Sequence, residues 1–303
     1  MRTSSILAFL VFTACGGGPD IGGPCDLEDL CDDGATCNLS AADGDGRSGT
    51  CIANDGDIDG DGLRNDKDFC NAIPGGTYDE DLDGVGDDCD RCPIARPLAA
   101  PDSDGDEVDG PCDPDPSVAG DRIVLFEGFN ATLPSGWKMV GNWEFRGGEV
   151  VATPPDGTTI GTLTAPLPLV TTRMAVLAQY RIDRVDAAAA QSLVGVTAID
   201  RRPAGVSAVT CGGQRAGAAD SLLLDTDTGA AAKPFANLFD TASRYRIAQK
   251  IEGIQAACSM IADAEQGAVG QTTGGEAPSE AGLLARAATA RFQYLLVVQR
   301  PPS

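Results

Sequence analysis

Hydrophobic and polar positions alternate in short runs through the second half of the chain. These runs are rich in β-branched and aromatic residues, and segments of Gly, Pro, Asp and Asn separate them, as is typical of strands joined by turns. The runs are RIVLFEGF (122–129), NWEFRGGEVVAT (142–153), GTLTAPLPLV (161–170), RMAVLAQYRI (173–182), SLVGVTAI (192–199), GVSAVTC (205–211), SLLLDT (221–226) and ARFQYLLVV (290–298). The pattern predicts an antiparallel all-β sandwich over residues 122–303.

One segment of this half, RYRIAQKIEGIQAACSMIAD (244–263), fits two patterns. Several isoleucines and Cys258 fall on one helix face, but apolar and polar residues also alternate on both sides of Gly253. We expect a hairpin that turns at Gly253. A disulfide between Cys211 and Cys258 would then join two strands.

The first half of the chain has a different composition. Residues 16–121 hold 29 Asp and Glu against 5 Lys and Arg, whereas residues 122–303 hold 16 of each sign. Only the second half has enough apolar residues for a sizeable core, so the acidic half must be held together by something else. The net charge of −23 excludes a general affinity for nucleic acids.

The N-terminus predicts export and a lipid anchor. Residues 1–15 have one Arg, an apolar run and small residues before Cys15, as in a signal peptide too short to span a bilayer once mature. The sequence FTAC resembles a bacterial lipobox, which implies lipidation of Cys15; the alternative is ordinary cleavage that leaves this thiol unmodified. Residues 16–24 form a Gly/Pro tether. We expect attachment to the cell envelope through the lipid alone, at the outer membrane or cell surface.

The chain has eleven cysteines, and ten remain if Cys15 carries lipid. An even number in an exported chain predicts a disulfide framework. Zinc is a poor alternative because there is no His and the surroundings are rich in Asp. Cys25, Cys31, Cys37 and Cys51 enclose a small module (25–51) that loosely resembles an EGF-type module; two bridges are expected, and three pairings are open.

An acidic pattern repeats between residues 55 and 113. It places carboxylates at positions 1, 3 and 5 of a loop, Gly at position 6, and further oxygen ligands at positions 9 and 12. The expected ligands are Asp57, Asp59, Asp61, Asn65 and Asp68 in the first copy, Asp79, Asp81, Asp83, Asp87 and Asp90 in the second, and Asp102, Asp104 and Asp106 in a partial third. Carboxylates that alternate in this way converge when the chain curls, and calcium suits them. The alternative is a solvated acidic linker.

Helical calcium-binding families do not fit these loops, because Pro74, Gly75 and Gly76 closely follow the first one. The motifs DxDxDGxxNxxDxC (57–70), DxDxDGxGDxCDxCP (79–93) and DxDxD…CD (102–113) resemble thrombospondin type 3 repeats. The resemblance implies calcium-wrapped carboxylates without regular secondary structure, and disulfides Cys70–Cys89 and Cys92–Cys112. The third copy departs from the pattern: Glu107 replaces the turn Gly, and Gly110 replaces the ligand at position 9.

The opening and closing strands of residues 122–303 resemble bacterial concanavalin A-like jelly rolls of the laminin-G type. The resemblance implies binding of a glycan or cell-surface protein ligand, or a structural role. Trp137 and Trp143 are expected to pack in the core rather than to stack on sugars, and Asp225 and Asp227 to lie in a plain turn.

The sequence gives little support for catalysis. Absence of His excludes Ser-His-Asp and Cys-His mechanisms. Glu127, Glu144 and Glu149 are available to a glycosidase, but they lack the E-x-D-x-x-E spacing of catalytic jelly rolls. We therefore expect no enzyme.

The sequence thus predicts a lipid-anchored, calcium-binding envelope protein. Residues 52–113 would form a calcium-stiffened rod and 114–121 a linker, which together present the sandwich for adhesion or glycan binding. The alternatives are a polysaccharide hydrolase with catalytic carboxylates on the jelly roll, or a purely structural envelope component.

Overall fold

The computed structural model describes residues 20–26, 28–39, 48–96, 102–202, 205–263 and 265–302. The predicted signal peptide and Cys15, the predicted lipidation site, lie outside these residues. The chain divides into two compact units, residues 1–90 and 91–303. Within the described part of both units the regular secondary structure is all β-strand, and no helix there is long and apolar enough to cross a membrane.

The first unit contains a small sheet in the order β1-β3-β2, formed by β1 (Pro24–Asp26), β2 (Ala35–Asn38) and β3 (Ser48–Ala53). Disulfides Cys25–Cys37 and Cys31–Cys51 fix it. These bonds select one of the three pairings that the sequence left open. They replace the core that such a short segment cannot form.

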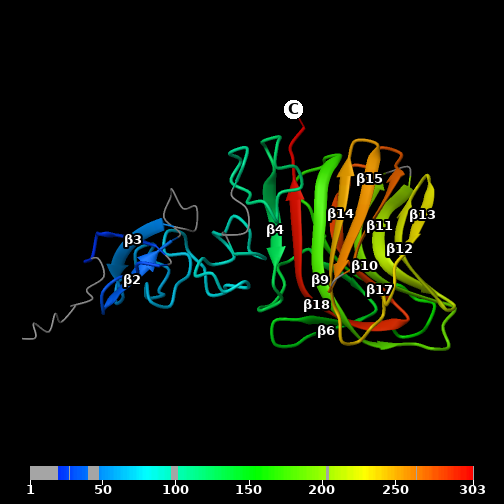
Figure 1. Ribbon diagram of the computed structural model, residues 1–303, viewed down its shortest axis with the longest axis horizontal. Coiled ribbons are helices and arrows are strands. Elements are labelled where there is room, and N and C mark those ends of the chain that lie inside the picture. Colours follow the sequence, from blue (N-terminus) through cyan, green and yellow to red (C-terminus); the bar gives the residue numbers. More distant parts are fainter. Residues whose placement is uncertain are drawn as a thin grey trace, which may run out of the picture. The chain divides into compact units, whose positions relative to one another are not determined.

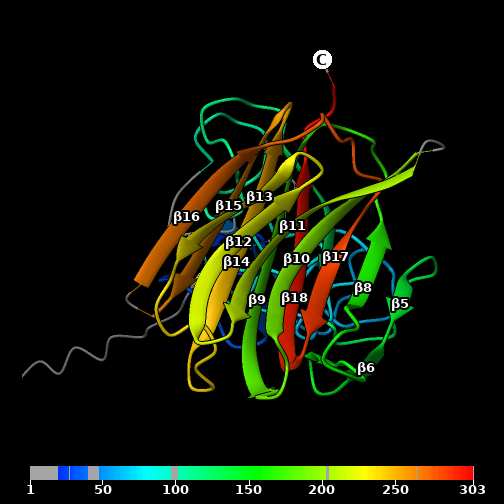
Figure 2. The same cartoon turned by 90° about the vertical axis from the view of Figure 1, so that its right-hand side faces the viewer.

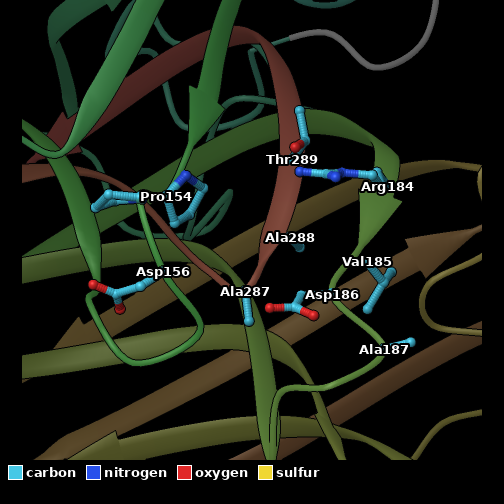
Figure 3. Close-up of a pocket in the computed structure, with 10 residues that line it drawn as sticks. Pro154, Asp156, Arg184, Val185, Asp186, Ala187, Ala287, Ala288 and Thr289 are labelled. Atoms are coloured by element: carbon cyan, nitrogen blue, oxygen red, sulfur yellow. The ribbon is translucent and has the colours of Figure 1, made fainter.

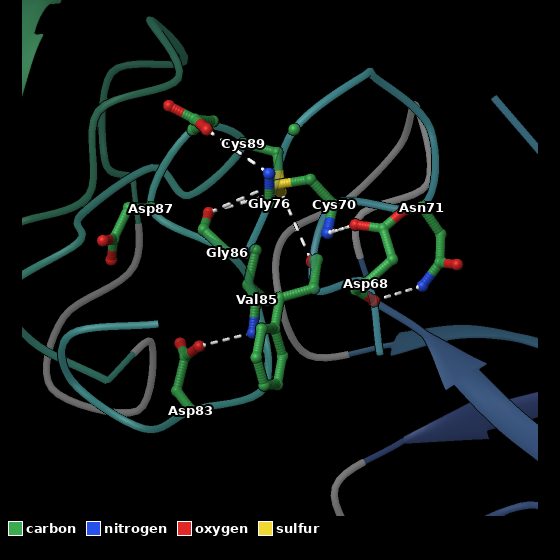
Figure 4. Close-up of a disulfide and its surroundings, with 12 residues drawn as sticks. Asp68, Cys70, Asn71, Gly76, Asp83, Val85, Gly86, Asp87 and Cys89 are labelled. Carbon is green, nitrogen blue, oxygen red and sulfur yellow. Dashed lines mark hydrogen bonds between the residues drawn. A yellow bond between two sulfur atoms is a disulfide. The ribbon is translucent and has the colours of Figure 1, made fainter. Parts of the chain in front are cut away.

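No described residue between β3 and β4 lies in a strand or helix. In the first unit this irregular segment is closed by the expected disulfide Cys70–Cys89 (Figure 4). Two glycines pack against Cys70: a Cβ at Gly76 would lie 2.6 Å from the Cys70 nitrogen, and one at Gly86 would lie 2.6 Å from its Sγ. Only residues without a side chain fit at these two positions.

The second unit is an antiparallel sandwich of two sheets (Figures 1 and 2), which confirms the predicted fold class. One sheet has the order β13-β12-β11-β10-β17-β8-β5 and the other β16-β15-β14-β9-β18-β7-β6, with β4 also paired to β18. The strands are β4 (Arg122–Glu127), β5 (Lys138–Val140), β6 (Asn142–Phe145), β7 (Val150–Thr153), β8 (Gly161–Pro166), β9 (Arg173–Val185), β10 (Gln191–Arg202), β11 (Gly205–Ala216), β12 (Ala219–Thr226), β13 (Gly229–Pro234), β14 (Arg244–Glu252), β15 (Gln255–Ala262), β16 (Glu265–Thr272), β17 (Glu280–Arg286) and β18 (Ala288–Gln299).

The core lies between the two sheets and follows the alternation of the strands. The segment that also fitted a helix is the expected hairpin of β14 and β15, and Gly253 adopts a φ of +61° in its turn. Cys258 points inward from β15 and bonds to Cys211 on β11, so this disulfide joins the two sheets through the core.

The third acidic copy belongs to the same compact unit as the sandwich. Cys92, Val108 and Cys112 form one apolar cluster with Tyr294, Leu296 and Val298 of β18. The Cys92–Cys112 disulfide lies in this cluster. The contact between the third acidic copy and β18 is hydrophobic. The linker predicted over residues 114–121 gave no indication of this contact.

Candidate functional site

Three loops place Asp side chains together: Asp57, Asp59 and Asp61; Asp79, Asp81 and Asp83; and Asp102, Asp104 and Asp106. Within each group the carboxylates offer oxygens that all lie within 4.8 Å of one another. Three separate loops therefore bring their position 1, 3 and 5 residues to one point, as their spacing predicts.

Backbone hydrogen bonds curl each loop around its first and third Asp. Oδ2 of the first Asp accepts from the N–H five residues later, with distances of 3.1, 2.9 and 2.9 Å in the three copies. Oδ1 of the third Asp accepts from the N–H two residues later, at 2.7, 2.8 and 3.1 Å. The same bonds in three copies show that the sequence repeat is a structural repeat.

Position 6 shows why glycine is preferred there. Gly62 and Gly84 adopt φ values of +95° and +94°, which glycine reaches without strain. In the third loop Glu107 adopts a φ of +74°, and its N–H still donates to Asp102. The substitution that departs from the motif therefore keeps the loop geometry, with local backbone strain of about 1 kcal/mol.

Several buried carboxylate oxygens in these loops have no hydrogen-bond partner. They include Oδ2 of Asp59 and both oxygens of Asp104. A buried carboxylate oxygen without a donor is costly unless a cation lies beside it. The donor set consists of hard carboxylate oxygens, which fits calcium rather than a soft metal.

The expected ligands at positions 9 and 12 are placed less uniformly. Asn65 is buried, but its Nδ2 donates to the Ala53 carbonyl at 2.7 Å and its Oδ1 accepts from Ile58 at 3.3 Å, so this side chain braces the loop. Asp68 is buried near the first group, and Figure 4 shows its carboxylate accepting from the Cys70 N–H.

In the second loop, Asp87 accepts a hydrogen bond from the Glu80 N–H at 2.8 Å. The remaining expected ligand of this loop, Asp90, is half-buried. The structure therefore brings the alternating trio of each loop together, while positions 9 and 12 contribute to different extents.

The sequence motif of the third loop ends on Asp113, but this residue was not among the expected ligands. It stands at position 12 of the third loop, eleven residues after Asp102, and its carboxylate is buried with Oδ2 lacking a hydrogen-bond partner. Burial raises the pKa of Asp113 to about 6, and the carboxylates of Asp106 and Asp104 add to the rise. Extending the offsets of the first two copies into the third would have identified this residue.

The carboxylates within each loop repel one another. Burial raises the pKa of Asp81 to about 7, and the neighbouring carboxylates of Asp83 and Asp79 contribute. Burial also raises the pKa of Asp87 to about 7. Burial raises the pKa of Asp68, with smaller contributions from the three Asp of its loop. Either a proton or a cation relieves this repulsion.

A second candidate site is a pocket of about 350 Å³ at one end of the sandwich (Figure 3). It lies between the β7–β8 connection, the β9–β10 connection and the turn from β17 to β18. The pocket presents two carboxylates, one guanidinium, one hydroxyl and apolar surface; the residues are Pro154, Pro155, Asp156, Arg184, Val185, Asp186, Ala187, Ala287, Ala288 and Thr289.

The polar groups of this pocket are held in place. Asp156 accepts from the N–H groups of Thr158 and Thr159 at 2.7 and 2.6 Å, and these bonds, with those from the two hydroxyls, hold its pKa well below the usual range. Asp186 accepts from Ala188 N–H at 3.0 Å. Figure 3 shows Arg184 extended towards Thr289.

The glutamates considered for catalysis are engaged in other contacts. Glu127 accepts from the Phe129 N–H at 2.8 Å. Glu144 pairs with Arg146 at the surface. Glu149 pairs with two arginines of neighbouring strands, Arg181 and Arg291.

A buried carboxylate that sequence reasoning did not single out is Glu280 on β17. Arg201 Nε donates to it at 2.6 Å, Lys138 is ion-paired to it, and the Thr164 hydroxyl donates at 3.2 Å. Burial alone would raise the pKa of Glu280, but the contacts with Arg201 and Lys138 bring it below its ordinary value. Glu280 is therefore an ionised, paired group rather than a proton donor.

The tryptophans pack as expected. Trp143 is buried against Phe292, and its indole N–H donates to the Val140 carbonyl at 2.9 Å. Trp137 is partly buried and meets Phe129 edge to face. Neither residue lines the pocket of Figure 3.

No protein-family model matches this chain, and no curated protein does. Solved structures match at the level of fold. The CBM2 module of Lactobacillus casei BL23 phage J-1 evolved Dit is 12% identical (TM-score 0.44; 61% of this chain and 98% of that one). A protein of unknown function with a galectin-like fold from Bacillus subtilis is 12% identical (TM-score 0.43; 59% and 97%). Bacillus licheniformis β-glucanase is 11% identical (TM-score 0.41; 59% and 98%).

These matches correct one expectation, namely that the chain is not an enzyme. Glycoside hydrolases are among the structures that it resembles in fold. At identities of 11–12% the likeness is one of fold. Any reaction has to be argued from residues of this chain.

Proposed function

We propose that this chain is a calcium-binding protein of the cell envelope, in which calcium orders three acidic loops. The observation that carries the proposal is the threefold recurrence of one carboxylate geometry, with buried oxygens that have no hydrogen-bond donor. Asp57, Asp79 and Asp102 begin the three loops, and Asp113 completes the third. At a dissociation constant of ~10⁻⁴ M, ~1 mM calcium adds about 1.4 kcal/mol of folding stability per site.

Thermal unfolding of loop variants tests this proposal. Asp59→Asn, Asp81→Asn and Asp104→Asn each remove the charge of one central ligand, and each should reduce the rise in Tm that 2 mM CaCl2 causes in the wild type. Asp225→Asn is the matched control, because Asp225 is exposed, lies on β12 rather than in the expected turn, and belongs to none of the three groups. If calcium raised the Tm of all four variants and of the wild type by the same amount, the proposal would be contradicted.

For the sandwich we propose carbohydrate as the ligand class, on the chemistry of the pocket in Figure 3. The carboxylates of Asp156 and Asp186 suit sugar hydroxyls as hydrogen-bond acceptors, and Arg184 supplies donors. The Pro154 and Pro155 rings offer apolar surface for the C–H face of a sugar ring. A volume of about 350 Å³ is in the range of small-molecule sites.

One experiment distinguishes carbohydrate binding from carbohydrate hydrolysis. The whole protein is incubated with a panel of polysaccharides, and both the bound fraction and newly formed reducing ends are measured. The double variant Asp156→Asn, Asp186→Asn should lose binding or cleavage, while Asp225→Asn retains it. Undiminished activity of the double variant would show that the pocket is not the site. The triple variant Glu127→Gln, Glu144→Gln, Glu149→Gln tests those glutamates separately.

Attachment through Cys15 is also part of the proposal and is supported by the FTAC sequence. Mass spectrometry of the protein from detergent-extracted envelopes should find a diacylated N-terminal peptide that begins at Cys15. Cys15→Ser should release the protein from the membrane fraction. An unmodified Cys15 in the wild-type protein would contradict the anchor.

A further inference from the structure

Three arginines lie side by side on the outer face of the sheet that contains β9. Arg291 of β18 and Arg244 of β14 both pair with Arg181 of β9, one from each side, because the three strands are neighbours (Figure 1). Adjacent residues such as Tyr180 and Phe292 point into the core, so the arginines lie on the solvent side of the sheet. Like charges at directly opposite positions of neighbouring strands repel one another.

Two carboxylates compensate part of this charge. Glu149, the residue before β7, forms ion pairs with Arg181 and Arg291 at 3.2 and 3.6 Å. Asp183 of β9 forms an ion pair with Arg291 at 2.6 Å. Both carboxylates therefore lie on the side of β9 and β18, and the side of β14 is left without one.

Arg244 and Arg246 of β14 carry the charge that is not compensated. Both side chains are exposed, and neither forms an ion pair or a side-chain hydrogen bond with a described residue. Asp263, which follows β15, accepts from the Ser243 hydroxyl at 2.6 Å and not from Arg244. Four arginines against two carboxylates leave two positive charges in excess on this face.

The outer face also has an unused hydrogen-bond donor at Arg181. Its Nε is shielded from solvent and has no hydrogen-bond partner among the described residues. A shallow hollow of about 10 Å³ lies beside Arg181, Arg244 and Arg291, which is enough for one group of the size of a water molecule. A shielded donor without an acceptor is costly, so an oxygen atom that a ligand supplies here would be favourable.

These arginines lie close to the pocket of Figure 3. Arg184, which lines that pocket, follows Arg181 by three residues on β9, or about 10 Å along a strand. The acidic residues that dominate the net charge lie outside the sandwich, since residues 122–303 hold 16 residues of each sign. The third acidic loop is tied to Arg300, past the other end of β18. A carbohydrate chain that leaves the pocket can therefore run over the arginines.

We propose that Arg181, Arg244, Arg246 and Arg291, here called the arginine row, bind the carboxylates of an acidic polysaccharide built from uronic acids. This inference rests on the proposal that the sandwich binds carbohydrate, and it adds the charge of the ligand. A guanidinium forms two parallel hydrogen bonds with a carboxylate, and two excess charges suit singly charged groups spaced along a chain. The pocket of Figure 3 would hold one sugar, and the arginine row would bind carboxylates of the sugars next to it.

Calorimetric titration of the whole protein with short oligogalacturonates tests the arginine row. The same oligomers with their carboxylates methyl-esterified are the uncharged control ligand. The wild type should bind the acid form more tightly, and the double variant Arg244→Ala, Arg246→Ala should weaken binding of the acid form by about tenfold or more, without affecting the ester. Arg181→Lys keeps the charge but loses the guanidinium fork, and should also weaken binding of the acid form.

The matched control variant is Arg122→Ala, Arg173→Ala. It removes the same charge from two exposed positions, at the start of β4 and at the start of β9, and should bind both ligands as the wild type does. Thermal unfolding of each variant checks that it is folded.

Two results would overturn the arginine row. One is equal affinity of the wild type and of Arg244→Ala, Arg246→Ala for the acid form. The other is a wild type that binds the acid form no more tightly than the ester, or binds neither. Binding of the ester, and its loss in Asp156→Asn, Asp186→Asn, reports on the pocket of Figure 3 alone. Failure of the arginine row and failure of the proposed carbohydrate site are thereby distinguished.

Discussion

Arg300, which follows β18, forms a two-point ion pair with Asp121, which precedes β4. Nε donates to Asp121 Oδ1 at 3.0 Å and a terminal guanidinium nitrogen donates to Oδ2 at 2.7 Å, with both side chains buried. The Asp121 N–H in turn donates to Asp106 of the third acidic loop at 2.7 Å. The third loop is thereby tied to the end of the last strand of the sandwich.

We predict that Arg300→Ala lowers the free energy of unfolding of the second unit by about 3 kcal/mol, because it leaves a buried carboxylate without its partner. Chemical denaturation at a fixed calcium concentration measures this. Arg146→Ala is the matched control, since the Arg146–Glu144 pair is exposed and its loss should change stability by less than about 0.5 kcal/mol. Equal effects of the two substitutions would contradict the structural role of Arg300.

The third loop should lose calcium affinity when Asp113 is changed. Asp113→Asn removes one buried charge from a group of carboxylates, so the number of calcium ions bound at 1 mM should fall by about one. Equilibrium dialysis with metal analysis measures the number. If the variant bound as many ions as the wild type, Asp113 would not be a ligand.

The Cys70–Cys89 region gives a prediction about packing. Gly60 and Gly76 have φ values of +80° and +83°, but a Cβ at Gly60 meets nothing within 4 Å, whereas one at Gly76 overlaps Cys70. Gly60→Ala should therefore lose about 1 kcal/mol from the unfavourable φ alone. Gly76→Ala should lose about 2 kcal/mol more through overpacking. Thermal unfolding of the oxidised protein would refute this account if both variants lost the same amount.

Stability should depend on pH in opposite ways with and without calcium. The pKa values of Asp81 and Asp87 are raised to about 7 in the folded, metal-free loops, so the folded state binds more protons than the unfolded state between about pH 4 and 7. Without calcium, the stability that Asp81 and Asp87 contribute is greatest below this window and is lost as pH rises through it.

Calcium requires the ionised carboxylates, so the stabilisation that it provides should grow over the same window. Tm measured from pH 4 to 8 in EDTA and in 2 mM CaCl2 checks both trends. A calcium-induced rise in Tm that does not change with pH would argue against binding at these carboxylates.

Much of the sandwich was predictable because its strands alternate regularly. The hairpin at Gly253 follows from alternation on both of its sides. β13, with the sequence GAAAKP, and β16, with EQGAVGQT, carry little apolar pattern and were not predicted. Both contain small or polar residues, so no local signal marks them as strands; pairing with β12 and β15 places them in the sheets.

The acidic loops were predictable in their local geometry but not in their long-range contacts. Alternating Asp residues give the trio of each loop, whereas Asp121 and Arg300 meet across most of the second unit. Such pairs depend on strand order, which the sequence pattern does not specify.

The most direct test of the account is a calorimetric titration of the oxidised whole protein with CaCl2 at pH 7.5, after removal of metal. The account predicts at least three calcium ions bound per chain, with one fewer in each of Asp59→Asn, Asp81→Asn and Asp104→Asn. Absence of binding heat, together with unchanged hydrogen exchange in the three loops, would contradict it. The repeats would then be an acidic segment held by disulfides alone.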